Sequence, residues 1–192
     1  MTDNKPKSNE IVIDYLENAF TEDELDNLSE MLSEANLSIW GHSHRPKHIN
    51  GIEDLFAQIT VILPPDLLQQ IVIGLAINGM YDCIKAFFSN LWRIIKTKKL
   101  TKIQGGKITE NVAPTVHIQA GDLKIVLPTE LEEEKFKHFV DRMFECINPE
   151  IIKEEKYGFY DADSGKIIFL TKHQIAERAM QEWQSKQDNN SL

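Results

Sequence analysis

Residues 67–99 read LLQQIVIGLAINGMYDCIKAFFSNLWRIIKTKK and form the longest apolar segment of the 192-residue chain. The preceding Pro-Pro-Asp, residues 64–66, is typical of a helix start, because Pro fits a first turn and a carboxylate is favourable at the positive end of the helix dipole. Apolar side chains then recur with helical spacing around most of the helix circumference, which is typical of a buried helix. The pattern predicts one long apolar central helix, bent near Gly74 or Gly79.

The same segment raises the question of a membrane span. A span needs about 20 predominantly apolar residues, and an ionisable group at bilayer depth is costly. Asn78, Asp82 and Lys85 fall in the middle of the segment. We therefore expect a helix buried in a protein core. The alternative is a membrane-associated protein that uses the apolar helix 67–95 and the basic end 93–107.

The charge of the chain is unevenly distributed. The net charge is −9, yet residues 93–107 hold six basic and no acidic residues. An acidic body argues against a nucleic-acid-binding protein, which needs a broad basic surface. The basic segment is either a solvated helix end or a docking patch for an acidic partner surface or an anionic membrane. The residues of this basic patch are Arg93, Lys96, Lys98, Lys99 and Lys102.

The two cysteines and the first residues bear on localisation. Cys83 and Cys146 both lie on apolar faces of expected helices, so we expect reduced core residues rather than a disulfide. Residues 1–10 are polar and lack the apolar run of a signal peptide. Both observations favour a cytoplasmic protein. No pattern indicates a cofactor.

The remaining pattern predicts an α+β fold, a mostly antiparallel sheet of the ferredoxin-like or a related kind, covered by helices. Residues 9–99 read as strand, helix, strand and the long apolar helix. Residues 114–187 read as hairpin, helix, hairpin and helix. The two stretches are either separate domains or one continuous domain with a loop at 100–113, where Gly105, Gly106 and Pro114 occur.

Local signals place the first elements. Residues 11–16 and 37–40 have the composition of strands, and residues 41–50 read as a polar loop. Thr21 and Glu24 fit the capping box of a helix between the two strands.

Two further segments are read from the same kinds of signal. Residues 52–63 have apolar side chains at helical spacing, although Ile59-Thr60-Val61-Ile62 is also good strand material, and we expect a helix. Thr129 and Glu132 fit a second capping box, and the helix that follows presents Phe136, Phe139, Val140, Met143, Phe144 and Ile147 on one face.

The sequence GHSHRPKH, residues 41–48, is the densest group of potential metal ligands. Its GHSHRP resembles the late GHTH motif of the calcineurin-like metallophosphoesterases, but the upstream Asp-x-His, Gly-Asp and Gly-Asn-His motifs of that family are absent. In an extended segment His42 and His44 would point to one face and could share a metal. Because no carboxylate neighbours occur at ligand spacing, we predict an exposed loop, no metal site and no catalytic residues. A metal-dependent hydrolase built on His42, His44 and His48 is an alternative.

The order of elements over residues 10–147 resembles the effector-associated constant component domains of bacterial conflict systems. The matching features are the apolar helix, Leu91-Trp92-Arg93 with its basic tail, and the hairpin that follows. The resemblance implies an adaptor or regulator beside an effector enzyme, with no catalytic residues. We therefore predict a non-enzymatic protein-interaction or regulatory module in a bacterial defence system, with an effector protein or another acidic surface as partner. The oligomeric state stays open.

Overall fold

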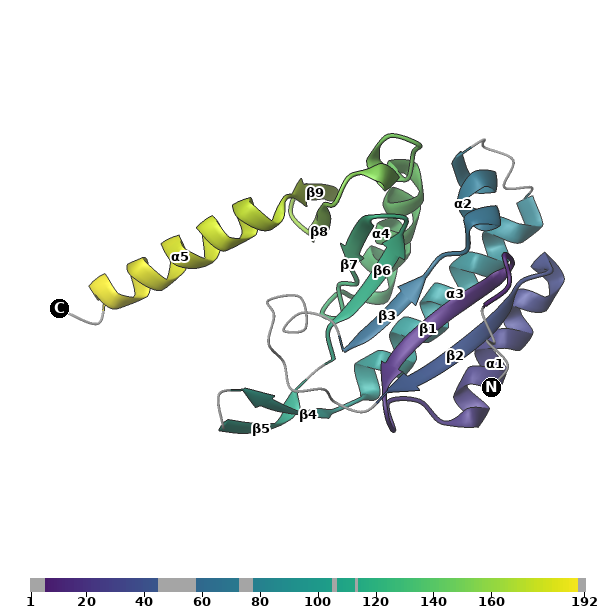
Figure 1. Cartoon of the computed structure of the whole chain (residues 1–192), viewed down its shortest axis with the longest axis horizontal. Helices are drawn as coiled ribbons and strands as arrows, with labels where there is room; N and C mark the ends of the chain where they lie inside the picture. The colour runs from purple at the N-terminus through teal and green to yellow at the C-terminus, as the bar shows by residue number, and fades with distance from the viewer. Residues whose placement is uncertain (1–5, 45–57, 73–77, 105–106, 113, 190–192) are drawn as a thin grey trace.

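A seven-stranded sheet forms the frame of the protein in a computed structural model that describes residues 6–44, 58–72, 78–104, 107–112 and 114–189 (Figure 1). Across the sheet the strands are β2 (Ser38–His44), β1 (Glu10–Leu16), β3 (Ile59–Ile62), β6 (Val116–Ala120), β7 (Leu123–Val126), β8 (Tyr157–Asp161) and β9 (Lys166–Leu170). The helices are α1 (Glu22–Leu32), α2 (Pro65–Val72), α3 (Asn78–Thr97), α4 (Glu133–Cys146) and α5 (Lys172–Asn189), with short 3₁₀ turns η1 (Ser33–Ala35) and η3 (Ile151–Lys153). A separate hairpin consists of β4 (Leu100–Gln104) and β5 (Lys107–Val112).

The sheet is mixed. Strands β1 and β2, β3 and β6, and β7 and β8 pair in parallel, whereas β1 and β3, β6 and β7, and β8 and β9 pair antiparallel. The α+β class is confirmed, but the mostly antiparallel, ferredoxin-like sheet is wrong. The reason lies in the connections, because a helix between two neighbouring strands returns the chain to the same end of the sheet and so makes the pair parallel. Helix α1 does this for β1 and β2, and α4 does it for β7 and β8.

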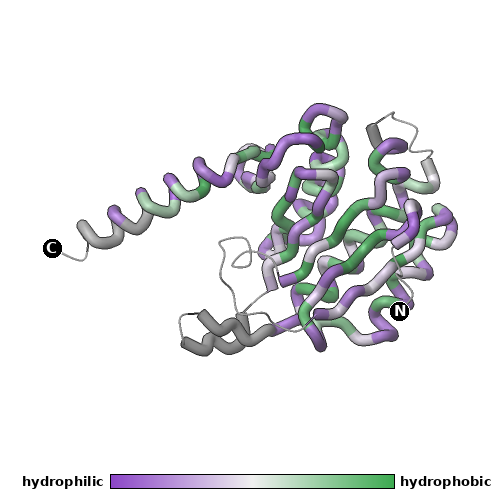
Figure 2. The backbone as a smooth tube through the Cα atoms, viewed as in Figure 1, coloured by the Kyte–Doolittle hydropathy of each residue, from purple (hydrophilic) through white to green (hydrophobic). Residues whose placement is uncertain are grey.

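Helices cover one face of the sheet. Ile11, Ile13 and Tyr15 of β1 belong to the core cluster together with buried residues of α1, α3 and α4. Successive strand residues point to opposite faces, so Val12 and Asp14 lie on the other face. Figure 2 shows the hydrophobic colour concentrated in the strands and in the helices behind them, whereas hydrophilic and hydrophobic turns alternate along α5. We call the face without the core helices the outer face.

The long apolar segment forms two helices rather than one. Helix α2 ends at Val72 and α3 begins at Asn78, and the intervening residues 73–77, including Gly74, lie outside the described residues. Helix α3 is amphipathic, because Phe87, Phe88 and Leu91 are buried while Asp82 and Arg93 are exposed. The prediction of a single long apolar helix is therefore wrong. Within the described parts of the chain, no helix combines the length and hydropathy that a membrane span requires.

Two predictions of irregular or helical structure are replaced by strands. Residues 59–62 form β3 and not a helix; residues 52–57 lie outside the described residues. The expected loop at 100–113 is largely the hairpin of β4 and β5. A short run of apolar residues can fit the period of a helix and that of a strand. In residues 59–62 all four side chains are β-branched, which favours a strand.

Several local predictions are confirmed. Thr21 and Glu24 form the capping box of α1, with Glu24 N donating to Thr21 Oγ1 at 3.2 Å and Thr21 N donating to Glu24 Oε2 at 2.9 Å. The buried face of α4 contains Phe136, Phe139, Val140, Met143 and Phe144. The second capping box is wrong, since α4 begins at Glu133 and Glu132 occupies its N-cap without a side-chain hydrogen bond.

Candidate metal centre

Three potential metal ligands meet on the outer face, near the edge of the sheet. The parallel pairing of β1 with β2 places Asp14 opposite His42 and Leu16 opposite His44. His42 and His44 are two residues apart on one strand, so their side chains leave the same face. Gly41 confirms which face this is, because a Cβ at Gly41 would lie 3.1 Å from Leu25 Cδ1 of α1, on the side of the helices. The two histidines therefore point away from the core.

Both imidazoles converge on one carboxylate oxygen. His42 Nδ1 lies 2.8 Å and His44 Nδ1 lies 3.0 Å from Asp14 Oδ1. The potential ligand atoms of the three residues all lie within 4.8 Å of one another. The side chains are partly accessible, with exposed fractions of 39% for Asp14, 54% for His42 and 31% for His44. An ion held there would keep positions open to water.

Neighbouring groups fix the orientation of the histidines. The ring of Trp40, two residues before His42 on β2, stacks on the ring of His42 with 5.5 Å between centroids and an interplanar angle of 6°. The rings of His42 and His44 are 6.5 Å apart. The end of β2 is held by Glu17 N, which donates to the carbonyl oxygen of His44 at 2.9 Å. The ligand group is therefore built on paired backbone and not on a free loop.

The donor atoms suit a divalent transition-metal ion. Zn²⁺ binds His nitrogen at about 2.0–2.1 Å and carboxylate oxygen at about 2.0–2.2 Å, so neighbouring ligand atoms in a tetrahedral site are roughly 3.3 Å apart. The two nitrogen atoms lie slightly closer than that to Asp14 Oδ1, and small side-chain rotations would provide the distance. Without an ion, the same geometry is a hydrogen-bond network in which both Nδ1–H groups donate to Asp14.

The structure corrects the expectation from the sequence for this segment. Residues 41–44 belong to β2 and not to a polar loop, and His48 lies outside the described residues. The sequence shows no carboxylate near the histidines, which is why it predicts no metal site. The folded chain does place one there, because the pairing of β1 with β2 brings Asp14 next to His42. The sequence does contain a sign that Asp14 has a special role, because it is the one carboxylate inside the apolar run of residues 11–16. The register of β1 against β2, which the sequence does not show, is what joins them.

The basic patch is not one free surface. Arg93 Nη2 lies 2.6 Å from Glu133 Oε1 of α4, and Lys98 Nζ lies 2.7 Å from Glu24 Oε2 of α1. Lys96 Nζ donates to the carbonyl oxygen of Leu131 at 3.1 Å and lies 4.3 Å from the ring centroid of Trp92. These contacts attach α3 to its neighbours.

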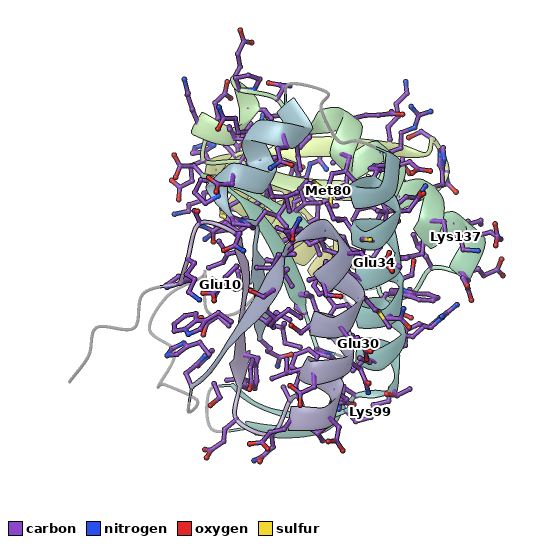
Figure 3. The ribbon with its side chains drawn as sticks, turned by 90° about the vertical axis from the view of Figure 1, so that its right-hand side faces the viewer. Glu10, Glu30, Glu34, Met80, Lys99 and Lys137 are labelled. Atoms are coloured by element: carbon purple, nitrogen blue, oxygen red, sulfur yellow. The ribbon has the colours of Figure 1, made fainter. Side chains whose placement is uncertain are left out.

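The two other residues of the basic patch differ from these. Lys99 is exposed, and Lys102 lies on β4 with its side chain outside the described residues. Figure 3 shows α1, with Glu30 and Glu34, beside the length of α3, which runs from Met80 toward Lys99. The cations of this region thus lie next to acidic α1 and do not form an isolated basic surface.

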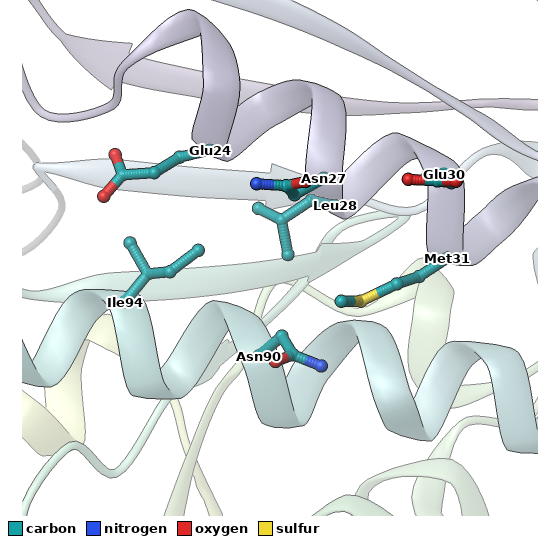
Figure 4. A pocket seen from close by; sticks show the side chains of 7 residues that line it. All are labelled: Glu24, Asn27, Leu28, Glu30, Met31, Asn90 and Ile94. Carbon is teal, nitrogen blue, oxygen red and sulfur yellow. The ribbon is translucent and has the colours of Figure 1, made fainter.

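An open groove of about 430 Å³ lies between α1 and α3 (Figure 4). Leu28, Met31 and Ile94 provide apolar lining, and Glu24 and Glu30 provide carboxylates. Partial burial raises the pKa of the Glu24 carboxyl, but the hydrogen bonds from Lys98 and Thr21 outweigh it and hold that pKa below its ordinary value. Asn27 and Asn90 complete the polar lining. Among the described residues, the group whose ligand atoms converge is that of Asp14, His42 and His44.

Comparison of the chain with models of protein families, with curated proteins and with solved structures finds no match. The function therefore has to be argued from the site itself.

Proposed function

We propose that the protein binds a divalent transition-metal ion through Asp14, His42 and His44, with Zn²⁺ as the ion that the ligand set suits best. The observation that carries the proposal is the convergence of two imidazole nitrogens on one carboxylate oxygen at 2.8 and 3.0 Å. Two histidines and one carboxylate, with further positions open to water, are a ligand set of catalytic zinc sites and of non-haem iron sites. The open positions also support the metal-dependent hydrolase suggested by the histidines.

The test is metal binding by the full chain purified without a histidine tag. Titration with Co²⁺, followed by its visible absorption, reports stoichiometry and ligand number, and competition with Zn²⁺ gives the relative affinity. We expect one equivalent to bind the wild type. His42→Ala, His44→Ala and Asp14→Asn should each weaken binding by at least about 100-fold, because changing groups that merely support metal ligands already costs 10- to 100-fold.

The matched control is His173→Ala on α5, whose side chain is 80% exposed and belongs to a different part of the fold. This variant should bind the metal as the wild type does. A wild type that binds no metal, or binding that survives in a His42→Ala/His44→Ala variant, would leave only the hydrogen-bond network. Asp14→Asn separates the two cases, since an amide oxygen still accepts a hydrogen bond but is a weaker metal ligand.

A second candidate is the protein-interaction or regulatory module of the bacterial cytoplasm that the order of elements suggests. The observation in its favour is α5, which extends away from the body and carries the exposed side chain of Met180 (Figure 1). A defence role with an effector protein as partner is the specific form of this proposal. If it is correct and the metal proposal is not, association measured with and without a chelator will be the same.

A further inference from the structure

Strand β9 forms one edge of the main sheet. It pairs with β8 on one side, and no described strand pairs with it on the other. An edge strand presents unpaired N–H and C=O groups, and proteins commonly protect such edges with prolines, bulges or charges. Residues 166–170, KIIFL, contain no proline and one charge, and their pairing with β8 is regular. This edge is therefore able to accept another strand.

Exposed apolar side chains occur on β9 and on the helix that follows it. Among the described residues, the large hydrophobic side chains that are exposed are Ile168 of β9, at 39%, and Met180 of α5, at 60%. Ile168 lies opposite Phe159 of β8 and on the outer face, because Ile167 and Phe169 pack toward the core. Ile168 therefore places exposed apolar surface directly beside the open edge, and Met180 places a second exposed apolar side chain on the helix that follows it.

Helix α5 extends into the space beyond β9. Figure 1 shows it leaving the sheet at the β9 end and continuing past that edge. Its apolar residues Ile175, Ala176, Ala179 and Met180 recur at helical spacing on one side, and the last three are exposed. Most of the stability of a helix in a protein comes from packing of its apolar face, so this face of α5 needs a surface to pack on. A body added at the β9 edge would provide it.

The two ends of β9 differ in charge. The turn before the strand carries Asp163, between Asp161 at the end of β8 and Lys166 at the start of β9, whereas α5 opens with Lys172 and His173. Asp163 is exposed, and Lys172 contacts Glu155 while remaining partly accessible. An antiparallel copy of β9 would bring the exposed Asp163 of one chain to the end of the strand where Lys172 of the other chain lies. These two groups of opposite charge then meet at both ends of the pair.

From these features we infer that two copies of this chain associate through β9, antiparallel about a two-fold axis at Ile168. Ile168 then faces its own copy, and Lys166 faces Leu170 of the other chain. The pairing is isologous, so one surface serves both subunits and the assembly closes as a dimer. The apolar side of α5, with Met180, packs on the other copy. This inference does not depend on the proposed metal site. It makes a second copy of the chain the partner in the protein-interaction function proposed above.

The first experiment measures molar mass by sedimentation velocity over micromolar concentrations of the full chain, with EDTA present so that metal plays no part. We expect a dimer for the wild type and a monomer, with an unchanged circular dichroism spectrum, for Ile168→Lys. Met180→Lys should weaken the dimer. The matched control is Ser43→Lys, which adds the same exposed charge to β2 at the opposite edge of the sheet and should leave the dimer intact.

The second experiment tests the register. Directly opposed residues of antiparallel strands have Cα atoms about 4.5–5.5 Å apart, which is within reach of a disulfide. Ile168→Cys should therefore give a covalent dimer under mild oxidation, and Ser43→Cys should not. The native Cys83 and Cys146 are half-buried and stay in both variants. A monomeric wild type, or a dimer that Ile168→Lys leaves intact, would overturn the inference; a dimer lost in Ser43→Lys would assign association to β2 instead.

Discussion

His117 makes the stability of the protein depend on pH in a way that one substitution removes. Its side chain is 3% exposed on β6, and its Nε2 has no hydrogen-bond partner among the described residues. The groups that face it are the ring of Tyr157, with 6.1 Å between centroids, and the cation of Lys124 on β7. Burial, and secondly the charge of Lys124, lower the pKa of His117 from its ordinary 6.5 to about 4.

The direction of the effect follows from proton uptake by the two states. Above pH 6.5 the imidazole is neutral in both the folded and the unfolded chain, and the stability it contributes is fully present. As pH falls from 6.5 to about 4, the unfolded chain takes up a proton that the folded chain does not, and the free energy of unfolding declines. At about 1.4 kcal/mol per unit of pKa the full loss is about 3 kcal/mol, and about 1 kcal/mol of it falls between pH 7.5 and 5.5. That is a sizeable part of a typical domain stability of about 5–15 kcal/mol.

The assay is urea unfolding of the wild type and His117→Leu at pH 7.5, 6.5 and 5.5, followed by circular dichroism. Leucine does not titrate and leaves no buried polar atom without a partner. The difference in free energy of unfolding between the two proteins should change by about 1 kcal/mol over this range in favour of the variant, while effects of other groups cancel. The lower limit stays above the isoelectric point of about 5.2, where association would interfere. Parallel pH curves for the two proteins would show that His117 is accessible to protons in the folded chain and would refute the reasoning.

The packing also predicts the effects of four other perturbations. Phe87→Asp or Leu91→Asp should abolish folding, because both side chains are 0% exposed and a buried unpaired carboxylate costs several kcal/mol; solubility and the thermal transition are the measurements, and an unchanged Tm would place that face of α3 outside the core. Gly121→Ala should lower stability by about 1–3 kcal/mol in urea unfolding, since Gly121 has φ +63° and a Cβ would collide with the carbonyl oxygen of Ile152; equal midpoints would mean that η3 moves aside freely. Tyr81→Phe should cost about 1–2 kcal/mol in urea unfolding at neutral pH by losing the 2.7 Å hydrogen bond to Asp141, which also binds Lys85 at 2.5 Å. Arg93→Ala should change the urea midpoint less than Tyr81→Phe does, because its ion pair with Glu133 is solvated.

What the sequence predicts correctly is local. The capping box at Thr21, the two hairpins of β6–β7 and β8–β9 and the apolar face of α4 each depend on residues within a few positions of one another, and each is found in the structure. The prediction failed where two periods fit the same residues, as in β3, or where a polar composition suggested a loop, as in β2. A strand at the edge of a sheet tolerates polar side chains on its solvated face, so the polar residues of β2 did not identify it.

The candidate metal centre could not be predicted for a different reason. Asp14 and His42 are separated by the whole of α1, and only the register of two parallel strands brings them together. The spacing of His42 and His44 identified half of the cluster from the sequence. The carboxylate had to come from the tertiary structure, and its absence from the local sequence led to the prediction of no metal site.

The middle of the sheet has a consequence for how the chain folds. β3 and β6 are neighbours and pair in parallel, although Ile59 and Val116 are about 57 residues apart in the chain. Closing a loop of that length costs about 4 kcal/mol of chain entropy beyond a constant, before any central contact forms. β3 and β6 belong to different halves of the polypeptide. A chain emerging from the ribosome can therefore pair β3 with β1, but the other edge of β3 stays open until β6 has been made. Non-local pairings of this kind slow folding and leave strand edges exposed during it. The nascent protein is therefore most vulnerable to aggregation in the interval between the synthesis of β3 and the pairing of β6.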